Sequence, residues 1–385
     1  MAQRVLLAGT SFSAVPILRA IQATGAQVTV CGNLSDDVCV EQAADYIDID
    51  YSQADDLYRI AKDGRFDAIV PSCNDEGYLA CAAVAEKLLL PGYDQLSMAW
   101  VLHSKHRFRD ALQRLRLRSP VVYAQGSATE ICLDRVRFPV IVKPVDNSGG
   151  KGISRAESMA ELAAALEASF KHSGAGLVLI EENISGSLHS HSAFISDGEI
   201  LEDFFADEYC TVYPFAVNCS NHPSFLPSAI RDEVRQSIKV LINDLRLSNG
   251  LLHTQFLRTE SGAVLVESMR RCPGDLFGDM IELSNDCNYY ANYVAPFLGR
   301  KLVRSTLPKA ERPIARHTIS RAEEKRLFDI EVGVPTLRTR VVPLHSCGAK
   351  IAPAPRDKCA LVFLEVASLD ALEEHTHNLA RNIHL

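Results

Sequence analysis

Apolar and polar positions follow two different periods along the first hundred residues. Four short apolar runs have the length and composition of buried strands. They are residues 4–8, 27–31, 48–51 and 68–71. The stretches between them carry apolar residues at helical spacing and predict helices at residues 14–24, 54–63 and 78–90. Strands that alternate with helices of this length predict an α/β fold with a doubly wound parallel sheet.

After residue 100 the pattern changes to paired strands and longer helices. The Asp-Gly turn at residues 197–198 predicts a hairpin between residues 192–195 and 199–205. Other apolar runs predict strands at residues 140–142, 177–180, 251–257 and 262–267. Helices are predicted at residues 158–172 and 228–245, and another opens after Ser104, its expected N-cap.

Two later segments complete the outline. Residues 207–227 have no regular period, which is typical of lids and binding loops. The last part of the chain predicts a small α+β unit, with strands at 338–343 and 360–366 and a helix at 368–381. We therefore expect three domains: an α/β domain at residues 1–103, a two-lobed α+β domain at 104–300, and the small unit at 301–385.

Composition and charge exclude several classes of protein. The chain has 385 residues, 47% of them hydrophobic, which is enough for two or three domains with a large core. Its formal charge of −8 offers no basic surface for nucleic acid or anionic membrane. No apolar run is long enough to cross a bilayer, and the first residues are expected to enter a strand, not to form a signal peptide. The eleven cysteines are scattered without a C-x-x-C pair, which indicates reduced thiols in a cytoplasmic protein.

The first chemical signal is the stretch FPVIVKPVDNSGGKGIS at residues 138–154. Gly149, Gly150 and Gly152 let the backbone adopt positive φ and approach a ligand closely. Successive exposed N–H groups in such a loop form an anion site, and Lys143 and Lys151 add positive charge beside it. Polyphosphate is the natural ligand, although a hairpin with a glycine-rich turn explains the stretch as well. The spacing matches neither the Walker A loop nor the dinucleotide fingerprint.

A second stretch, GAVLVESMRR at residues 262–271, is an apolar strand that ends in a carboxylate and two arginines. The strand before it carries Gln255. Together the two stretches resemble the ATP-grasp superfamily, in its carboxylate–amine ligase branch, which is related to carbamoyl phosphate synthetase-type domains. The order of motifs is that of the superfamily, and the resemblance covers about residues 1 to 300.

The resemblance implies a set of nucleotide contacts. It implies that a lysine at a helix start and the glycine loop hold the phosphates, and that the chain after strand 177–180 binds adenine through main-chain groups while Ile184 packs on the ring. The expected nucleotide-binding residues are Lys105, Lys143, Ser148, Gly149, Gly150, Lys151, Gly152, Glu181, Glu182, Ile184 and His189. The sequence departs from the family where a ribose-binding carboxylate is expected, because Leu188 or His189 stands there. We expect that either His189 replaces the carboxylate or the ribose is held differently.

The resemblance also implies a metal and a catalytic centre. Glu267 and Gln255 are the expected ligands of Mg²⁺ or Mn²⁺, while Met269 stands where many relatives have a metal-binding Asn. The expected catalytic residues are Arg271, which suits a transferring phosphoryl group or a carboxylate, and Lys151. The expected substrate contacts are Arg271, Gly274, Asn74 and Glu76. Turn chemistry and helix capping explain Asn74, Glu76 and Gly274 about as well.

These observations lead to a functional hypothesis. We expect an ATP-dependent ligase that joins a small-molecule carboxylate to an amine through an acyl phosphate and releases ADP and phosphate. One alternative is an ATP-grasp enzyme that activates bicarbonate or another small carboxylate. An alternative of a different class is a non-catalytic nucleotide-binding regulatory protein, which the changes at Leu188, His189 and Met269 suggest. The expected partners are small molecules and, by analogy, a second copy of the chain.

Overall fold

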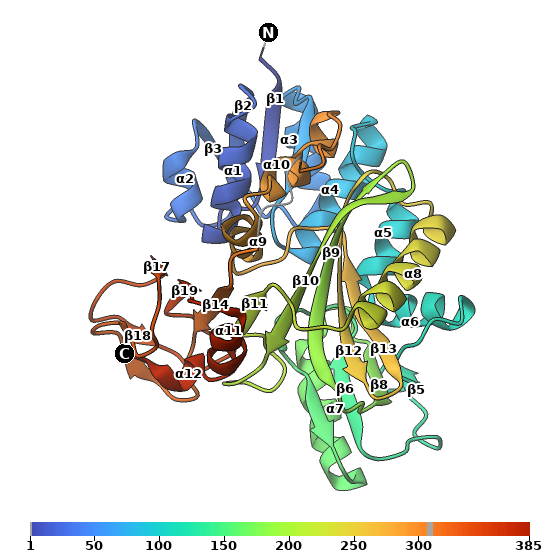
Figure 1. The fold of residues 1–385 in the computed structure, drawn as a ribbon. Coiled ribbons are helices and arrows are strands. Elements are labelled where there is room, and N and C mark those ends of the chain that lie inside the picture. Colours follow the sequence, from blue (N-terminus) through green and yellow to red (C-terminus); the bar gives the residue numbers. More distant parts are fainter. Residues whose placement is uncertain (1, 306–310) are drawn as a thin grey trace.

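Four parallel strands form the sheet of the N-terminal lobe, the blue part of Figure 1. The computed structural model describes residues 2–305 and 311–385; residues 1 and 306–310, which fall in the first and third predicted domains, lie outside the described residues. The order is β3-β2-β1-β4, with strands β1 (Arg4–Ala8), β2 (Gln27–Gly32), β3 (Asp45–Asp48) and β4 (Ala68–Pro71). The prediction of a doubly wound parallel sheet is confirmed.

Helices cover both faces of this sheet, because successive buried side chains of β1 point to opposite faces. Val5 and Leu7 pack into one core cluster with helix α1 (Val15–Gln22), while Leu6 and Ala8 pack into another with α3 (Ala54–Asp63). The remaining helices of the lobe and its connection are η1 (Phe12–Ala14), α2 (Val38–Gln42), α4 (Asp75–Leu88), α5 (Leu96–His103) and α6 (Lys105–Arg114).

One expectation for this lobe was wrong, and one helix was missed. The third strand lies at residues 45–48, not 48–51, because it pairs with β2 from Thr29 opposite Asp45. Helix α5 was not predicted. Its sequence LSMAWVLH is apolar all round, so it lacks the amphipathic period that marks a helix, and it buries Ala99 and Leu102 all the same.

A second, antiparallel four-stranded sheet has the order β5-β8-β6-β7. Its elements are β5 (Val122–Gly126), β6 (Val140–Pro144), β7 (Ser154–Ala156), β8 (Val178–Glu182) and helix α7 (Met159–His172). Helix α7 packs on this sheet, and Ser158 caps it by accepting a hydrogen bond from the Glu161 N–H. The glycine-rich loop is the connection between β6 and β7, so strand pairing anchors both of its ends.

The largest sheet has eight strands in the order β13-β12-β9-β10-β11-β14-β19-β17. Its central part comprises β9 (Ser187–Ser196), β10 (Glu199–Tyr209), β11 (Cys219–His222), β12 (Gly250–Thr259) and β13 (Gly262–Met269). The predicted hairpin is the antiparallel pair β9–β10. Helix α8 (Ser228–Leu245) buries its predicted apolar stripe against this sheet. The segment 207–227 is less irregular than expected, because it contains the end of β10 and all of β11.

The C-terminal strands extend the same sheet, as Figure 1 shows for β14 beside β11. Helices α9 (Phe277–Asn285), α10 (Tyr289–Val294) and η2 (Pro296–Leu298) lead to them. The later elements are β14 (Ile314–Ile319), β15 (Lys325–Arg326), β16 (Glu331–Val332), β17 (Arg338–Pro343), β18 (Lys350–Ile351), β19 (Ala360–Glu365), α11 (Leu369–Thr376), α12 (Leu379–Asn382) and β20 (Ile383–His384). The predicted terminal helix is therefore two short helices. The domain boundaries at 103 and 300 stay predictions.

Two further features bear on the expectations from composition. All eleven cysteines are free thiols. None of the helices in the described residues is both long and apolar enough to cross a membrane.

Candidate active site

One large cavity, of about 2020 Å³, lies between the three sheets. Its floor is one face of the eight-stranded sheet, because alternate residues of several strands line it: His253, Gln255 and Leu257 on β12, Arg316 and Thr318 on β14, and Arg340 and Val342 on β17. The glycine loop lines it as well, and so do residues of the N-terminal lobe. The cavity therefore joins most of the elements that carry the predicted site residues.

The glycine loop approaches its neighbours closely. Gly149 and Gly150 have φ of 69° and 77°. A Cβ on Gly150 would lie 2.4 Å from the carbonyl oxygen of Phe215, whereas one on Gly149 would meet nothing within 4 Å. The Lys105 ammonium donates to the carbonyl oxygen of Asn147 at 2.5 Å, and Ser148 and Lys151 line the cavity. The segment IVKPVDNSGGKG, residues 141–152, thus contains a loop that other segments hold in place.

Gly152 differs from the other glycines of the loop. It is not among the residues that line the cavity, and a Cβ there would lie 2.7 Å from the Cβ of His172 on α7. Its carbonyl oxygen accepts a hydrogen bond from Ser169 of the same helix. The structure therefore gives Gly152 a packing role against α7, and its nucleotide contact stays a prediction.

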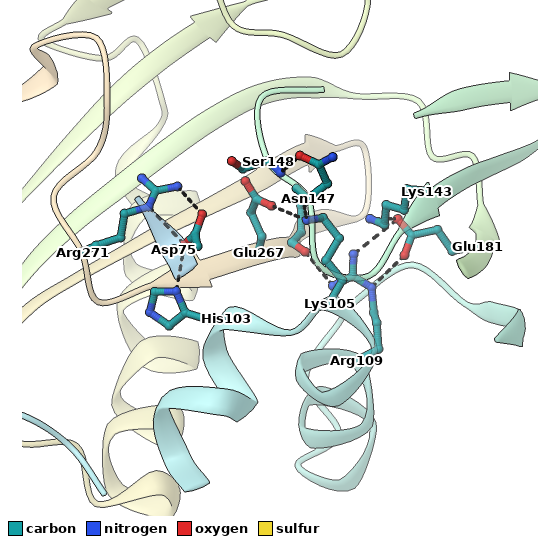
Figure 2. A network of polar contacts seen from close by, with 11 residues as sticks. Asp75, His103, Lys105, Arg109, Lys143, Asn147, Ser148, Glu181, Glu267 and Arg271 are labelled. Atoms are coloured by element: carbon teal, nitrogen blue, oxygen red, sulfur yellow. Dashed lines mark hydrogen bonds and ion pairs between the residues drawn. The ribbon is translucent and has the colours of Figure 1, made fainter. Parts of the chain in front are cut away.

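Lys143 and Glu181 meet beneath the loop with a third residue that the sequence did not indicate (Figure 2). The Arg109 Nε donates to Glu181 Oε2 at 2.9 Å, and the Lys143 ammonium donates to Glu181 Oε1. Burial lowers the pKa of Lys143 to about 8, against the attraction of Glu181. Burial opposes ionisation of Glu181, but the attraction of Lys143 and Arg109 outweighs it and lowers its pKa. Glu181 is therefore a buried carboxylate paired with two cations.

The predicted metal ligands stand opposite each other on adjacent strands. Gln255 of β12 pairs in register with Glu267 of β13. The Lys105 ammonium lies 3.9 Å from Glu267 Oε2, so it connects the glycine loop with this carboxylate, as Figure 2 shows. The Gln255 amide donates to Glu208 Oε2 at 2.6 Å, which directs its carbonyl oxygen away from Glu208. These hard oxygen atoms fit Mg²⁺, which takes few protein ligands when it binds with a triphosphate.

Arg271 follows the strand that carries Glu267, and it forms a bidentate ion pair with Asp75. Its Nε and Nη2 donate to the two carboxylate oxygens at 3.0 and 2.8 Å (Figure 2). The His103 Nδ1 lies 2.8 Å from Asp75 Oδ1, and the His103 Nε2 accepts from the Arg270 N–H. Because that backbone N–H can only donate, a neutral His103 carries its proton on Nδ1 and donates it to Asp75. Burial raises the pKa of Asp75, but Arg271 and His103 together bring it well below its usual range.

Two other predicted contacts, His189 and Asn74, have partners within the protein. His189 has Asp207 at 2.7 Å from Nδ1 and Ser187 at 2.7 Å from Nε2, so both ring nitrogens are engaged and its ribose role stays a prediction. Asn74 caps α4 by accepting from the Gly77 N–H. Neither Asn74 nor Glu76 is among the residues that line the cavity, whereas Glu182, Ile184 and Gly274 are. The capping explanation for Asn74 is the one that the structure bears out.

Sequence reasoning missed five residues that the fold brings to this region: Asp75, His103, Arg109, Glu208 and Arg316. Asp75 lies directly between the two predicted residues Asn74 and Glu76, at the start of α4. Nothing local distinguishes the others, because each has a hydrogen-bond partner more than 40 residues away. Their contacts depend on tertiary structure alone.

The chain is similar to known proteins in sequence and in fold. Residues 117–275 match the family model D-ala D-ala ligase C-terminus. The D-alanine–D-alanine ligase of Streptococcus thermophilus is 27% identical over 164 residues, which are 40% of this chain and 46% of the relative. The chain thus spans about half the length of the curated relatives it matches. The L-amino acid ligase of Bacillus licheniformis has a TM-score of 0.82 with 19% identity and covers 99% of this chain and 98% of its own.

The fold is that of the ATP-grasp superfamily. A third similar structure is the biotin carboxylase domain of Hydrogenobacter thermophilus 2-oxoglutarate carboxylase, which was solved with MgADP and bicarbonate. Its TM-score is 0.76 at 17% identity, and the match covers 100% of this chain and 90% of that chain. The predicted resemblance to the ATP-grasp superfamily and its amino-acid ligase branch is confirmed.

Proposed function

We propose that this ATP-grasp protein is an ATP-dependent carboxylate–amine ligase that forms an amide bond through an acyl phosphate. The observation that carries the proposal is the position of Lys105. Its ammonium donates to the glycine loop at Asn147 and lies 3.9 Å from Glu267, so the phosphate loop and the metal carboxylate face one cavity. Similarity to D-alanine–D-alanine and L-amino acid ligases supports the same activity.

Most of the predicted residues have a role in this proposal. Bound MgATP supplies a transferable phosphoryl group that makes a carboxylate electrophilic. Backbone N–H groups of the glycine loop hold the phosphates together with Lys105, Lys143 and Lys151. Glu267 and the carbonyl oxygen of Gln255 hold the metal, and the chain at Glu181–Ile184 holds the base. The pair Lys143–Glu181 is fixed by Arg109, so the lysine is positioned before the nucleotide arrives.

Arg271 acts in this proposal on the reacting groups. A guanidinium has five N–H donors, of which Arg271 uses three, two toward Asp75 and one toward the carbonyl oxygen of Cys272. Two donors therefore remain for the oxygens of the carboxylate or the phosphoryl group. Charge-assisted donors held in place in this way stabilise developing negative charge without reorganisation. Gly274 borders the same space and is assigned to the substrate.

Three broader features belong to the proposal as well. We propose that residues 1–103, 104–300 and 301–385 act as separate lobes that close around the substrates. We further propose a cytoplasmic location, which agrees with the free cysteines, and a homodimer, by analogy. These can be tested by limited proteolysis, by fractionation of cells and by light scattering of the purified protein.

The activity is tested by measuring release of ADP and phosphate from MgATP with pairs of small carboxylic acids and amines, amino acids first. We expect release only when an acid and an amine are both present, and we expect one amide product to form for each ADP released. Release stimulated by bicarbonate alone would replace the proposal with the bicarbonate-activating alternative. Tight MgATP binding without turnover on any pair would favour a regulatory nucleotide-binding protein.

A further inference from the structure

Ser187, His189 and Asp207 form a chain of hydrogen bonds at the start of β9. The Ser187 Oγ lies 2.7 Å from His189 Nε2, and the His189 Nδ1 lies 2.7 Å from Asp207 Oδ1. Ser187 and His189 are two positions apart on β9, so their side chains point to the same face. Asp207 of β10 stands directly opposite His189 in the pairing of the two strands. Strand geometry therefore holds a hydroxyl, an imidazole and a carboxylate in a row.

This row differs from the other histidine–aspartate pairs of the protein. Three further histidines pair with an aspartate at 2.8 Å, namely His103 with Asp75, His191 with Asp203 and His345 with Asp357. In the described part of the chain, none of these three has a hydroxyl within hydrogen-bond distance of its other ring nitrogen. Conversely, the Nδ1 of His253 contacts Ser192 Oγ at 2.6 Å, but no carboxylate of the described residues lies within 4.0 Å of that ring. Among the described histidines, only His189 joins a hydroxyl to a carboxylate.

The partners of Asp207 fix the direction of proton donation along the row. Besides His189, three groups donate to this carboxylate: the Asn221 amide at 3.0 Å, the Phe225 N–H at 2.9 Å and the Ser224 hydroxyl. Burial raises the pKa of Asp207, but the hydrogen bonds from His189 and its other donors outweigh burial and lower it. Because an ionised carboxylate can only accept, a neutral His189 carries its proton on Nδ1 and offers the Nε2 lone pair to the Ser187 hydroxyl. His189 is thus placed as a general base for Ser187.

The hydroxyl is the accessible member of the row, and a cation stands beside it. Ser187 is exposed, whereas His189 and Asp207 are 6% and 3% exposed. Arg258 of β12 lies directly opposite Ser187 in the sheet, which places the two side chains on one face with their Cβ atoms about 5 Å apart. In the part of the chain that the structure describes, no carboxylate lies within 4.0 Å of this guanidinium. Its charge therefore stabilises negative charge that develops on a group attacked by Ser187.

The row lies on the other face of the sheet from the proposed metal site. The His189 ring stacks on Phe256 with 5.6 Å between the ring centroids, and Phe256 packs in the core cluster that contains α8. Gln255, the neighbour of Phe256 on β12, points to the opposite face, toward the floor of the large cavity. That cavity also extends to Ser187 and Arg258, which are among the residues that line it. Chemistry at Ser187 is therefore separate from the proposed phosphoryl transfer.

We propose that Ser187 is the nucleophile of a second active site, which hydrolyses small carboxylic esters. The Ser187 oxygen attacks the ester carbon while His189 Nε2 takes its proton, and Asp207 stabilises the imidazolium. The ester C–O bond breaks, the imidazolium returns the proton to the departing alcohol, and an acyl-serine remains. Water then attacks the acyl group with His189 again as the base, the carboxylic acid leaves, and the Ser187 hydroxyl is restored. Arg258 stabilises the oxyanion in both steps.

The class of substrate follows from the modest oxyanion stabilisation that the site offers. Arg258 is exposed, so solvent and salt screen its charge. A single preorganised donor to an oxyanion is worth about 10²–10³ in rate, and a screened cation supplies less. Esters with acidic leaving groups need less of this stabilisation than amides do. The site therefore acts on activated esters and leaves amides, including the product of the proposed ligase, intact.

The first measurement is labelling of the full chain by an alkyl fluorophosphonate, which phosphonylates activated serines and leaves ordinary hydroxyls unreacted. The labelled peptide is identified by mass spectrometry, and we expect it to carry the label on Ser187. Labelling should be about 100-fold slower or more in Asp207→Asn, the low end of what a positioned general base contributes. In Arg258→Gln it should be about tenfold slower, because a screened cation is worth less than a fixed donor. Ser185→Ala is the matched control, since Ser185 is exposed two positions earlier and its variant should label normally.

The second measurement is steady-state hydrolysis of p-nitrophenyl acetate. The exposed thiols of Cys132 and Cys347 also attack aryl esters, so both are replaced by serine in every protein compared. We expect sustained turnover in Ser185→Ala and a loss of about 100-fold or more in Ser187→Ala. Both serines are exposed, so neither variant should change the midpoint of urea unfolding, which is measured alongside.

Several results would overturn the proposal. They are an unlabelled Ser187 in the folded, unchanged chain, equal ester hydrolysis in Ser187→Ala and Ser185→Ala, and labelling of Asp207→Asn at the rate of the unchanged chain. If Asp207→Asn does not fold, the comparison of the two exposed serines and the slower labelling of Arg258→Gln decide the matter. No step of these tests uses ATP, so the outcome is independent of the ligase assay, which depends on ADP release with an acid and an amine.

Discussion

Asp75 and Arg271 form a bidentate ion pair, with contacts of 3.0 and 2.8 Å, between the N-terminal lobe and the turn after β13. They are 196 positions apart in the chain. The pair holds the proposed catalytic guanidinium at the edge of the cavity and leaves two of its donors free. The parallel-sheet lobe thereby helps to fix the geometry of the proposed reacting centre.

Asp75→Asn should lower kcat by about 10- to 100-fold, because one charge-assisted contact that orients Arg271 becomes neutral. The KM for MgATP should change little. The matched control is Asp94→Asn, since Asp94 pairs with the neighbouring Arg270, which does not line the cavity. Both variants should lose stability in urea unfolding. Equal kcat losses in the two would show that Asp75 acts through stability alone.

Glu267→Gln should weaken binding of Mg–ATP and leave metal-free ATP binding nearly unchanged. A neutral amide is a poorer ligand for Mg²⁺ than a carboxylate, because the hard cation prefers anionic oxygen. Titration with Mg²⁺ at fixed ATP measures the shift, which we expect to be tenfold or more. Glu260→Gln is the control, because Glu260 is exposed at the far end of the same hairpin. An unchanged Mg²⁺ requirement in Glu267→Gln would remove this residue from the metal site.

Gly150→Ala should weaken nucleotide binding more than Gly149→Ala. Both positions have positive φ, so both variants lose about 1–2 kcal/mol from backbone strain. Only at Gly150 would the new Cβ also collide with the Phe215 carbonyl oxygen, 2.4 Å away, and shift the loop. Equilibrium dialysis with ATP compares the two variants directly. Equal losses would mean that the contact with Phe215 does not shape the phosphate loop.

Glu181→Gln should destabilise the protein by about 3–5 kcal/mol, because it leaves the charges of Lys143 and Arg109 buried without an anion. The change is read from the midpoint and slope of urea unfolding. Asp244→Asn breaks an ion pair with Arg114 that is largely exposed, and it should have no measurable effect. A small effect of Glu181→Gln would indicate that water reaches this cluster.

Glu282 should make the stability depend on pH. Burial raises its pKa from 4.5 to about 7, so between these values the folded protein binds a proton that the unfolded chain releases. The contribution of Glu282 to stability therefore falls as pH rises from 4.5 to 7 and stays unfavourable above 7. Glu282→Gln should stabilise the protein at pH 8, by roughly 1–3 kcal/mol, and hardly at pH 4.5. The exposed Glu167→Gln should show no such trend, and a constant difference for Glu282→Gln would contradict the prediction.

Periodicity and spacing determined much of the architecture from the sequence. The parallel sheet, the hairpin β9–β10, helix α8 and the strands that carry Gln255 and Glu267 all follow from local patterns, because each is set by neighbours within a few residues. The glycine loop was visible for the same reason. Helix α5 was not, since a helix that is apolar on every side has no period to detect.

Only the tertiary structure decided which charges meet. Glu181 was expected to contact the nucleotide, and only the fold reveals that it is buried between Lys143 and Arg109. The proposed ribose contact of His189 stays a prediction, and only the fold reveals that Asp207 and Ser187 engage both of its nitrogens. Among the buried arginines of the described residues, Arg316 is the one that forms no ion pair within 4.0 Å. Such relations depend on distances between segments far apart in the chain, and a linear sequence does not contain those distances.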